Sequence, residues 1–288
     1  MNRRLGARLG ALLLFAMLAW VGYTQNQGPR PELTINKVHD NLYEIVGDGG
    51  NVAVLVTTEG IVLVDDKFEQ DHDAILAKIK TVSKQPVKYV INTHYHQDHS
   101  GGNAKFLPTA DVISTQNART NILQHKQSNV TGSPVAPARI VFNDETAVFL
   151  GGKEVRAKFF GRGHTNGDAV VYFPQLKTIH TGDLMAGTSP LIDYNGGGSL
   201  LEWTKTLDAV MSTLDFDTVI PGHGNVTNKA GLKAYRDDIV KLQTRVRGLV
   251  RGGKTQAEVA RVMTDEYKWA PNSLQQQWSV PGMMKEMK

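Results

Sequence analysis

The chain contains no cysteine, and this absence excludes three kinds of chemistry. Without thiols the fold has no disulfide, no thiolate metal ligand and no cysteine nucleophile. Any metal site must therefore be built from histidine and carboxylate side chains. The composition is otherwise that of a globular protein, with 41% hydrophobic and 21% charged residues. At 288 residues we expect one folded domain.

An excess of one charge sign is also missing. The formal charge is +4, of which three arginines in the first 24 residues supply +3, so the rest of the chain carries +1. No concentrated Lys/Arg stripe occurs elsewhere in the sequence, which argues against nucleic-acid binding. We expect a small uncharged or anionic substrate and no nucleic-acid partner, while the oligomeric state is left open.

Long hydrophobic runs are absent except near the N-terminus. There the apolar run Leu9 to Val21 follows Arg3, Arg4 and Arg8 and is short for a membrane span. We interpret residues 1–25 as a signal peptide, with an uncleaved N-terminal anchor as the alternative and the sole membrane contact expected. Residues 26–288 would then form an exported, periplasmic protein whose C-terminal part is a helical extension.

Strand-like and helix-like segments alternate in two successive halves of the chain. The expected strands are 41–46, 51–57, 60–65, 87–92, 147–150, 154–160, 169–173, 177–180 and, as the last one, 217–220. The expected helices are 71–83, 116–126, 199–213, 228–251 and one capped by Thr255, with capping boxes at 199–202 and 255–258. The tail from Trp269 shows no clear period. This order predicts an α/β fold of two packed sheets with helices outside, a four-layer αββα sandwich.

The densest chemical signal is the run His94-Tyr-His-Gln-Asp-His99. His94 and His96 are two residues apart just beyond a strand, so their side chains point the same way. The glycine-rich turn that follows brings Asp98 and His99 towards a second position. A polar surface loop is the alternative, but three imidazoles and a carboxylate within six residues favour a metal site.

Three later turns supply further candidate ligands. His164 lies in a glycine-rich turn between two strands, Asp183 follows His180-Thr-Gly, and His223 lies in Pro-Gly-His-Gly. Each alone is more typical of a solvated turn residue, yet together with the first run they indicate a metal centre. We interpret His180 as a strand-end residue, with a role behind the ligands as the alternative.

These motifs, in this order, resemble the metallo-β-lactamase superfamily over residues 33–226. The resemblance implies the αββα fold, a first metal on His94, His96 and His164, and a second on Asp98, His99 and His223, with Asp183 bridging. Two zinc ions are expected, with iron or manganese as alternatives. Family lactamases that use a cysteine ligand carry it where Asp183 falls, so the aspartate moves this chain towards the glyoxalase II pattern.

The resemblance also implies a reaction. Hydroxide bound between two cations would attack a carbonyl carbon, and Asp98 would orient it and carry its proton to the leaving group. We expect a β-lactam or a related cyclic amide or ester as substrate. A glyoxalase II-like thioester hydrolase and an iron-dependent oxidoreductase are alternatives, whereas a non-catalytic binding protein or a phosphodiesterase is less favoured.

Four residues near these motifs have less certain roles. Asp65 matches a family aspartate that orients a ligand histidine, or else it only ends a strand. Tyr194 and Asn195 lie in a loop that either borders the pocket or is a linker. Tyr95 is expected to be packed rather than catalytic.

Overall fold

The computed structural model describes residues 30–125, 133–187 and 189–288. The expected signal peptide at 1–25 lies outside these residues, as does Lys126 at the end of an expected helix. Residues 33–288 cluster into one structural unit. Within the described ranges, none of the helices has both the length and the apolar character that a membrane crossing requires.

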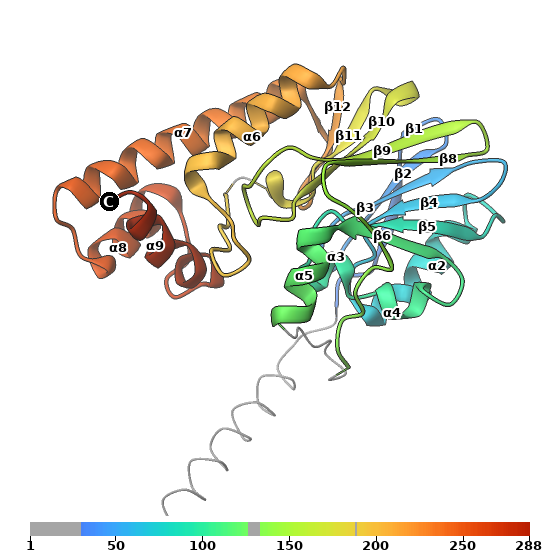
Figure 1. Cartoon of the computed structure of the whole chain (residues 1–288), viewed down its shortest axis with the longest axis horizontal. Helices are drawn as coiled ribbons and strands as arrows, with labels where there is room; N and C mark the ends of the chain where they lie inside the picture. The colour runs from blue at the N-terminus through green and yellow to red at the C-terminus, as the bar shows by residue number, and fades with distance from the viewer. Residues whose placement is uncertain (1–29, 126–132, 188) are drawn as a thin grey trace, which may run out of the picture. The chain divides into compact units, whose positions relative to one another are not determined.

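Two β-sheets form the centre of this unit (Figure 1). The first has the order β1-β2-β3-β4-β5-β6-β7, antiparallel up to β4 and parallel beyond it. Its strands are β1 (Thr34–His39), β2 (Leu42–Val46), β3 (Val52–Val56), β4 (Ile61–Val64), β5 (Val87–Ile91), β6 (Asp111–Thr115) and β7 (Ile140–Phe142). The second, ordered β13-β12-β11-β10-β9-β8, contains β8 (Glu145–Leu150), β9 (Lys153–Phe159), β10 (Ala169–Phe173), β11 (Thr178–His180), β12 (Thr218–Ile220) and β13 (Thr227–Asn228).

Strands β3 and β4 in the middle of the first sheet are buried on both faces, which explains their continuous apolar sequences. In β3, Ala53 and Leu55 belong to the core between the sheets, together with Val171 of β10. Val52 and Val54 of the same strand belong to a separate core on the outer face of the first sheet. Since successive strand residues point to opposite faces, both sets must be apolar to fill both cores.

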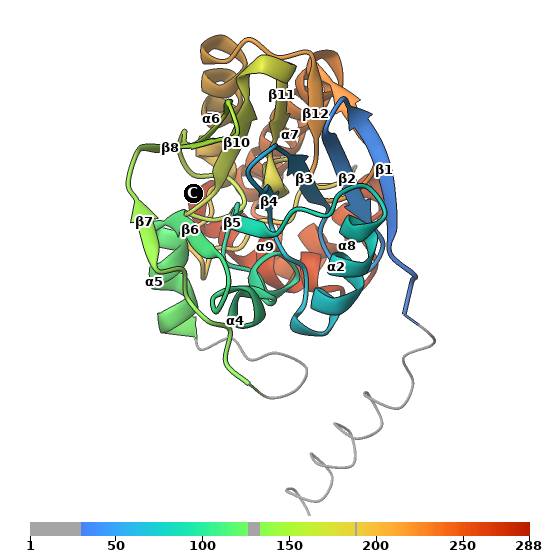
Figure 2. The ribbon, with the colours of Figure 1, turned by 90° about the vertical axis from the view of Figure 1, so that its right-hand side faces the viewer.

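Helices cover the outer face of each sheet (Figure 2). The helices are α2 (His72–Lys80), α3 (Gln97–Ser100), α4 (Asn103–Phe106), α5 (Gln116–His125), α6 (Leu200–Thr213), α7 (Lys229–Arg251), α8 (Gln256–Tyr267) and α9 (Leu274–Glu286). Ile75 of α2 and Phe106 of α4 pack in the outer core of the first sheet. Trp203 of α6 and Ile239 of α7 pack in that of the second. The layers are helix, sheet, sheet and helix, which confirms the αββα sandwich.

The helix starts agree with the expected caps except in one detail. Thr255 and Glu258 form the complete capping box of α8. At α6, the Ser199 side chain accepts from the Glu202 amide, but the Glu202 carboxylate pairs with Arg162 instead of returning to Ser199. The predicted capping box at 199–202 is therefore only half present.

Several elements were not predicted from the sequence. β12 is not the last strand, because β13 pairs with it through Val219 and Thr227. Strands β1, β6 and β7 were also missed, as was α9, which contains Pro281 in its interior. A proline inside a helix removes one backbone hydrogen bond. Here burial of Val280 and Met283 in the large helical core stabilises the helix despite that loss.

Candidate metal centre

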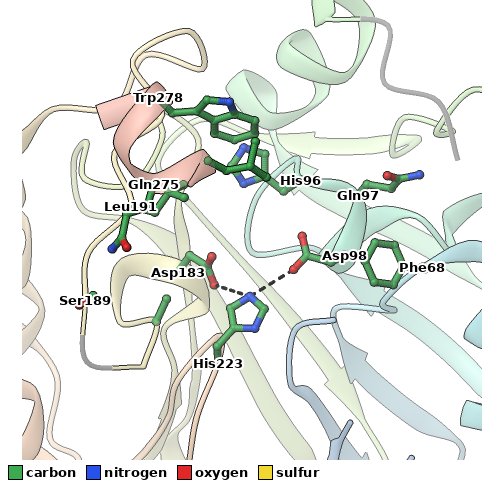
Figure 3. Close-up of a pocket in the computed structure, with 12 residues that line it drawn as sticks. Phe68, His96, Gln97, Asp98, Asp183, Ser189, Leu191, His223, Gln275 and Trp278 are labelled. Atoms are coloured by element: carbon green, nitrogen blue, oxygen red, sulfur yellow. Dashed lines mark ion pairs between the residues drawn. The ribbon is translucent and has the colours of Figure 1, made fainter. Parts of the chain in front are cut away.

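The seven predicted ligands come together at one edge of the sandwich. His94 and His96 follow β5, His164 lies between β9 and β10, and Asp183 and His223 follow the parallel strands β11 and β12. Figure 3 shows Asp98, Asp183 and His223 facing one another. Because β11 and β12 are parallel neighbours, Asp183 and His223 lie at the same end of the second sheet, and the packing of the two sheets places this end beside the end of β5.

The first cluster, here called the three-histidine group, consists of His94, His96 and His164. Their donor atoms all lie within 4.8 Å of one another. His96 Nδ1 is 3.1 Å from His94 Nε2 and 2.8 Å from His164 Nε2. All three residues are buried. Burial lowers the pKa of His94 well below its usual value and that of His164 to about 4, so both imidazoles are neutral donors near neutral pH.

The outward nitrogens of this group donate to oxygen atoms. His164 Nδ1 donates to the Leu191 carbonyl at 2.7 Å, and His96 Nε2 donates to Asp193 Oδ2 at 3.0 Å. A neutral imidazole carries one N–H, so each inward nitrogen presents a lone pair. Converging lone pairs repel unless a cation lies between them, and this arrangement fits a bound metal ion.

Asp193 also holds the surrounding loop. Its Oδ2 accepts from the Tyr95 hydroxyl as well as from His96, and its Oδ1 accepts from the Gly196 amide at 3.0 Å. Burial alone would raise the pKa of Asp193, but these hydrogen bonds and His96 lower it. Sequence reasoning missed Asp193, because no motif links it to a histidine 97 residues away.

The second cluster, here called the carboxylate group, consists of Asp98, His99 and His223. His223 Nε2 is 3.1 Å from Asp98 Oδ2 and 3.2 Å from His99 Nε2. Burial alone would lower the pKa of His99 and of His223, but nearby carboxylates raise both. Burial would likewise raise the pKa of Asp98, yet His99 and His223 lower it. Because carboxylates raise the pKa of both imidazoles, a cation that binds here would compete with protons.

Asp183 lies between the two groups. Its carboxylate is 3.3 Å from His99 Nε2, 3.6 Å from His223 Nε2 and 3.7 Å from His164 Nε2. Its Oδ1 is buried and makes no hydrogen bond to any residue that the structure describes. A buried carboxylate oxygen left without a donor, and facing imidazole nitrogens, also fits a cation.

Asp65 supports both groups from behind. Its Oδ2 accepts from His99 Nδ1 at 2.7 Å and from the Thr93 hydroxyl at 2.8 Å. Thr93 Oγ1 in turn lies 3.0 Å from His94 Nδ1. Asp65 does end β4, but it also has the contact needed to orient His99.

Glycines let the backbone approach the site closely. A Cβ added at Gly50 would lie 2.2 Å from His99 Cε1, and one at Gly222 would lie 2.0 Å from Asp183 Oδ1. The buried Lys67 holds the Gly50 loop by donating to the carbonyls of Asp48 and Gly50 at 2.8 and 2.5 Å. Burial lowers the pKa of Lys67 to about 8. No sequence pattern indicated that Lys67 holds this loop, because a lysine after two acidic residues matches no motif.

The residues with less certain roles are now placed. His180 donates to the Asn51 carbonyl and accepts from the Gly182 amide, so its ring is used within the fold. Tyr95 is buried against Ala118 and Ile122, as expected.

Of the two alternatives for Tyr194 and Asn195, the pocket border is not the one that the structure shows. Tyr194 points to the C-terminal helix, where its hydroxyl donates to Glu286 at 2.7 Å, and Asn195 is exposed. Neither lines the cavity, whereas Ser189 and Leu191, just before them, do.

A cavity of about 620 Å³ opens over the donor groups (Figure 3). His96, Asp98, Asp183 and His223 form part of its lining. The other lining residues are Phe68, Gln97, Ala186, Ser189, Leu191, Leu274, Gln275 and Trp278. The site thus combines a floor of possible cation ligands with space for a small molecule.

Comparisons with known proteins agree with this geometry. A sequence model described as the metallo-beta-lactamase superfamily matches residues 45–223. The chain is 29% identical to metallo-beta-lactamase type 2 of Bacillus cereus over 209 residues, 71% of this chain and 78% of the relative. It is 28% identical to metallo-beta-lactamase IND-1 of Chryseobacterium indologenes over 176 residues, 60% and 71% of the two chains. A metallo-beta-lactamase from Pontibacter korlensis shares the fold with a TM-score of 0.64 and 22% identity, over 72% of this chain and 98% of that one.

Proposed function

Because the chain belongs to the metallo-beta-lactamase superfamily and is a metal-dependent hydrolase of small molecules, we propose that it cleaves a β-lactam or a related cyclic amide or ester. The names of its relatives support the β-lactam, and the cavity has the size of a small-molecule site. The substrate is the part of this proposal that the experiment below tests.

The proposed ligands are those of the two donor groups. His94, His96 and His164 hold one cation, Asp98, His99 and His223 hold the other, and Asp183 contacts both. The observation that carries this assignment is the position of two oxygen acceptors, because the Asp193 carboxylate and the Leu191 carbonyl take the outward N–H groups of His96 and His164 and leave inward lone pairs. Imidazole and carboxylate donors suit Zn²⁺, which we propose for both positions, with iron or manganese as alternatives.

Bound there, two divalent cations would lower the pKa of a water molecule and polarise the substrate carbonyl. Asp98 is the proposed catalytic residue. Its side chain is 26% exposed and lines the cavity, and its Oδ2 faces His223 and His99. Because these imidazoles lower its pKa, Asp98 is anionic, and its other oxygen can orient the attacking water and accept its proton once the cations have lowered the pKa of that water. It then returns that proton to the leaving nitrogen or oxygen.

The location of the enzyme is part of the proposal. Residues 1–25 act as a signal peptide, and 26–288 are the exported, periplasmic enzyme. Its hydrolase domain ends in a helical extension formed by α7, α8 and α9. Arginines before a short apolar run support this assignment.

Thioester hydrolysis is the second candidate, favoured by Asp183 at the position between the two groups. An iron-dependent oxidoreductase is a third, and metal analysis separates it from the others, since it requires iron.

The test is a hydrolysis screen of β-lactams, lactones and a glutathione thioester on metal-quantified protein. We expect turnover of a β-lactam or lactone, lost in His96→Ala. Turnover of the thioester alone would favour the second candidate. Turnover that survives His96→Ala would contradict the proposed site.

A further inference from the structure

The outer wall of the cavity is formed by the C-terminal helix α9. Leu274, Gln275 and Trp278 of this helix line the cavity, and Figure 3 shows Trp278 beside His96. The ring centroid of Trp278 is 5.5 Å from that of His96. The family match ends at residue 223, so this wall lies outside the segment that identifies the family.

The first half of α9 is fixed to the segment that carries Leu191. Gln275 Nε2 donates to the Pro190 carbonyl at 2.8 Å, and the Ile192 amide donates to Ser279 Oγ at 2.9 Å. These two bonds hold the helix to the backbone on either side of Leu191, which is itself a lining residue.

The second half of α9 is held by Glu286. Its carboxylate accepts from the Tyr194 hydroxyl at 2.7 Å, from the Leu201 amide at 3.2 Å and from the Ser199 hydroxyl at 2.5 Å. A Cβ at Gly282 would lie 1.9 Å from the Tyr194 ring, so helix and loop are in direct contact. Because both halves of α9 are anchored, the wall is preformed before any ligand binds.

The chemistry of this wall is apolar. Leu274 is 61% exposed, and Phe68, Leu191 and Trp278 are further large apolar side chains that line the cavity. Among the lining residues that the structure describes, none is Lys or Arg, and the titratable ones are Asp98, Asp183, His96 and His223. Away from the metal positions, a substrate carboxylate would therefore have no lysine or arginine of the lining to pair with. An apolar group, in contrast, would bury its surface against Trp278 and Leu274.

We propose that Trp278 and Leu274 are specificity-determining residues that bind an uncharged apolar substituent beside the scissile carbonyl. The enzyme then prefers esters and amides with an apolar acyl or aryl group over those that carry a second carboxylate there. This inference rests on the proposed hydrolytic function of the same site.

A matched pair of esters tests the preference. p-Nitrophenyl hexanoate and mono-p-nitrophenyl adipate have acyl chains of equal length, but the second ends in a carboxylate. We expect the zinc-loaded wild-type enzyme to favour the hexanoate by about tenfold or more in kcat/KM, as expected for burial of a few methylene groups.

Substitutions in α9 locate the preference. Trp278→Ala should lower kcat/KM for the hexanoate about tenfold, mainly through KM, while the adipate changes by less than about twofold. Leu274→Ala should have about a threefold effect in the same direction, and Trp278→Leu, which keeps an apolar side chain, should retain most of the preference. Phe149→Ala is the matched control, because Phe149 is 72% exposed and does not line this cavity. An equal loss for both esters in Trp278→Ala would overturn the inference.

A binding measurement separates this inference from the proposed function. Hexanamide and its terminal carboxylate analogue adipamate are titrated calorimetrically into the zinc-loaded wild type and Trp278→Ala. If neither ester is cleaved but hexanamide binds more tightly than adipamate through Trp278, the proposed hydrolysis of such bonds fails and the apolar wall is supported. If both esters are cleaved with a ratio that Trp278→Ala leaves unchanged, the wall is contradicted and the hydrolytic function is supported.

Discussion

The two donor groups of the candidate centre differ in burial and in charge. His94 and His164 of the three-histidine group are 1% and 0% exposed, whereas the side chains of Asp98 and His223 in the carboxylate group are 26% and 37% exposed. The first group offers neutral imidazoles held from behind. The second combines Asp98 and His223 at the cavity surface with the fully buried His99. If a cation binds at each position, we expect the buried one to be retained and the one at the cavity surface to exchange with solvent.

Protonation differs in the same way. Burial lowers the pKa of His94 and His164, so the first group needs no proton release before it binds a cation. In the carboxylate group, burial is outweighed and the pKa values of His99 and His223 are raised. A cation must displace protons there, so its affinity should fall as the pH falls.

The largest effect should come from Asp183, which touches both groups. Asp183→Ala removes the anion between them and should lower kcat/KM by roughly a thousandfold or more, with bound metal falling below two ions per chain. Steady-state kinetics and elemental analysis measure both quantities. Asp208→Ala is the control, since Asp208 pairs with Arg236 on the surface. Two fully bound ions in Asp183→Ala would contradict its bridging position.

Removing one histidine from each group separates them. We expect His164→Ala and His223→Ala each to lose about one ion and about a hundredfold in kcat/KM. In His223→Ala the remaining ion lies in the buried three-histidine group, so a chelator should remove it slowly. In His164→Ala the remaining ion lies in the more exposed carboxylate group, so a chelator should remove it quickly. Equal rates of metal removal in the two variants would contradict the proposed difference in exchange between the two donor groups.

Carboxylates behind the histidines should act mainly on one group each, since Asp65 contacts His99 directly and reaches His94 only through Thr93. Asp193→Asn should weaken cation binding by the three-histidine group about 10–100-fold, since His96 loses its acceptor charge. Asp65→Asn should weaken the carboxylate group through His99 by a similar factor. Competition with a fluorescent zinc chelator gives both affinities. The assignment fails if Asp193→Asn affects only the more weakly bound ion.

Acidification should release the ions in order. Between pH 8 and pH 6 the carboxylate group should lose roughly tenfold in affinity per pH unit for each proton displaced, because the pKa values of His99 and His223 are raised. The three-histidine group should stay loaded until the pH approaches the pKa of His164, about 4. Metal content after dialysis at stepped pH checks this order, and loss of both ions together would disprove it.

The smallest effect should come from Glu286, which anchors α9. Glu286→Gln removes a charge that accepts three hydrogen bonds and should cost about 1–3 kcal/mol of unfolding free energy. Thermal unfolding of the zinc-loaded protein measures it. Because α9 contacts the loop that carries Asp193, any change in metal affinity should fall on the three-histidine group. Weakening of the carboxylate group alone would mean that the two groups are not separately supported.

The sequence predicted the elements and residues that depend on local patterns. Buried strands such as β3 have continuous apolar runs, and His94 to His99 concentrate their donors within six residues. Asp193 could not be found this way, because its bond to His96 exists only after the loop folds over β5. Helix α9 was missed because Pro281 weakens its helical signal, while its stability comes from burial against distant elements. Glu202 likewise pairs with Arg162, 40 residues away, instead of completing the predicted capping box.

The long sequence separation within the carboxylate group has a consequence for folding. His99 and His223 lie 124 residues apart, one beyond a strand of each sheet, so this group cannot exist before the two sheets dock. Closing so long a loop is entropically costly and is expected late on the folding pathway. Uptake of a cation by His99 and His223, followed during refolding with a spectroscopically visible ion such as Co²⁺, would then time the docking of the two halves.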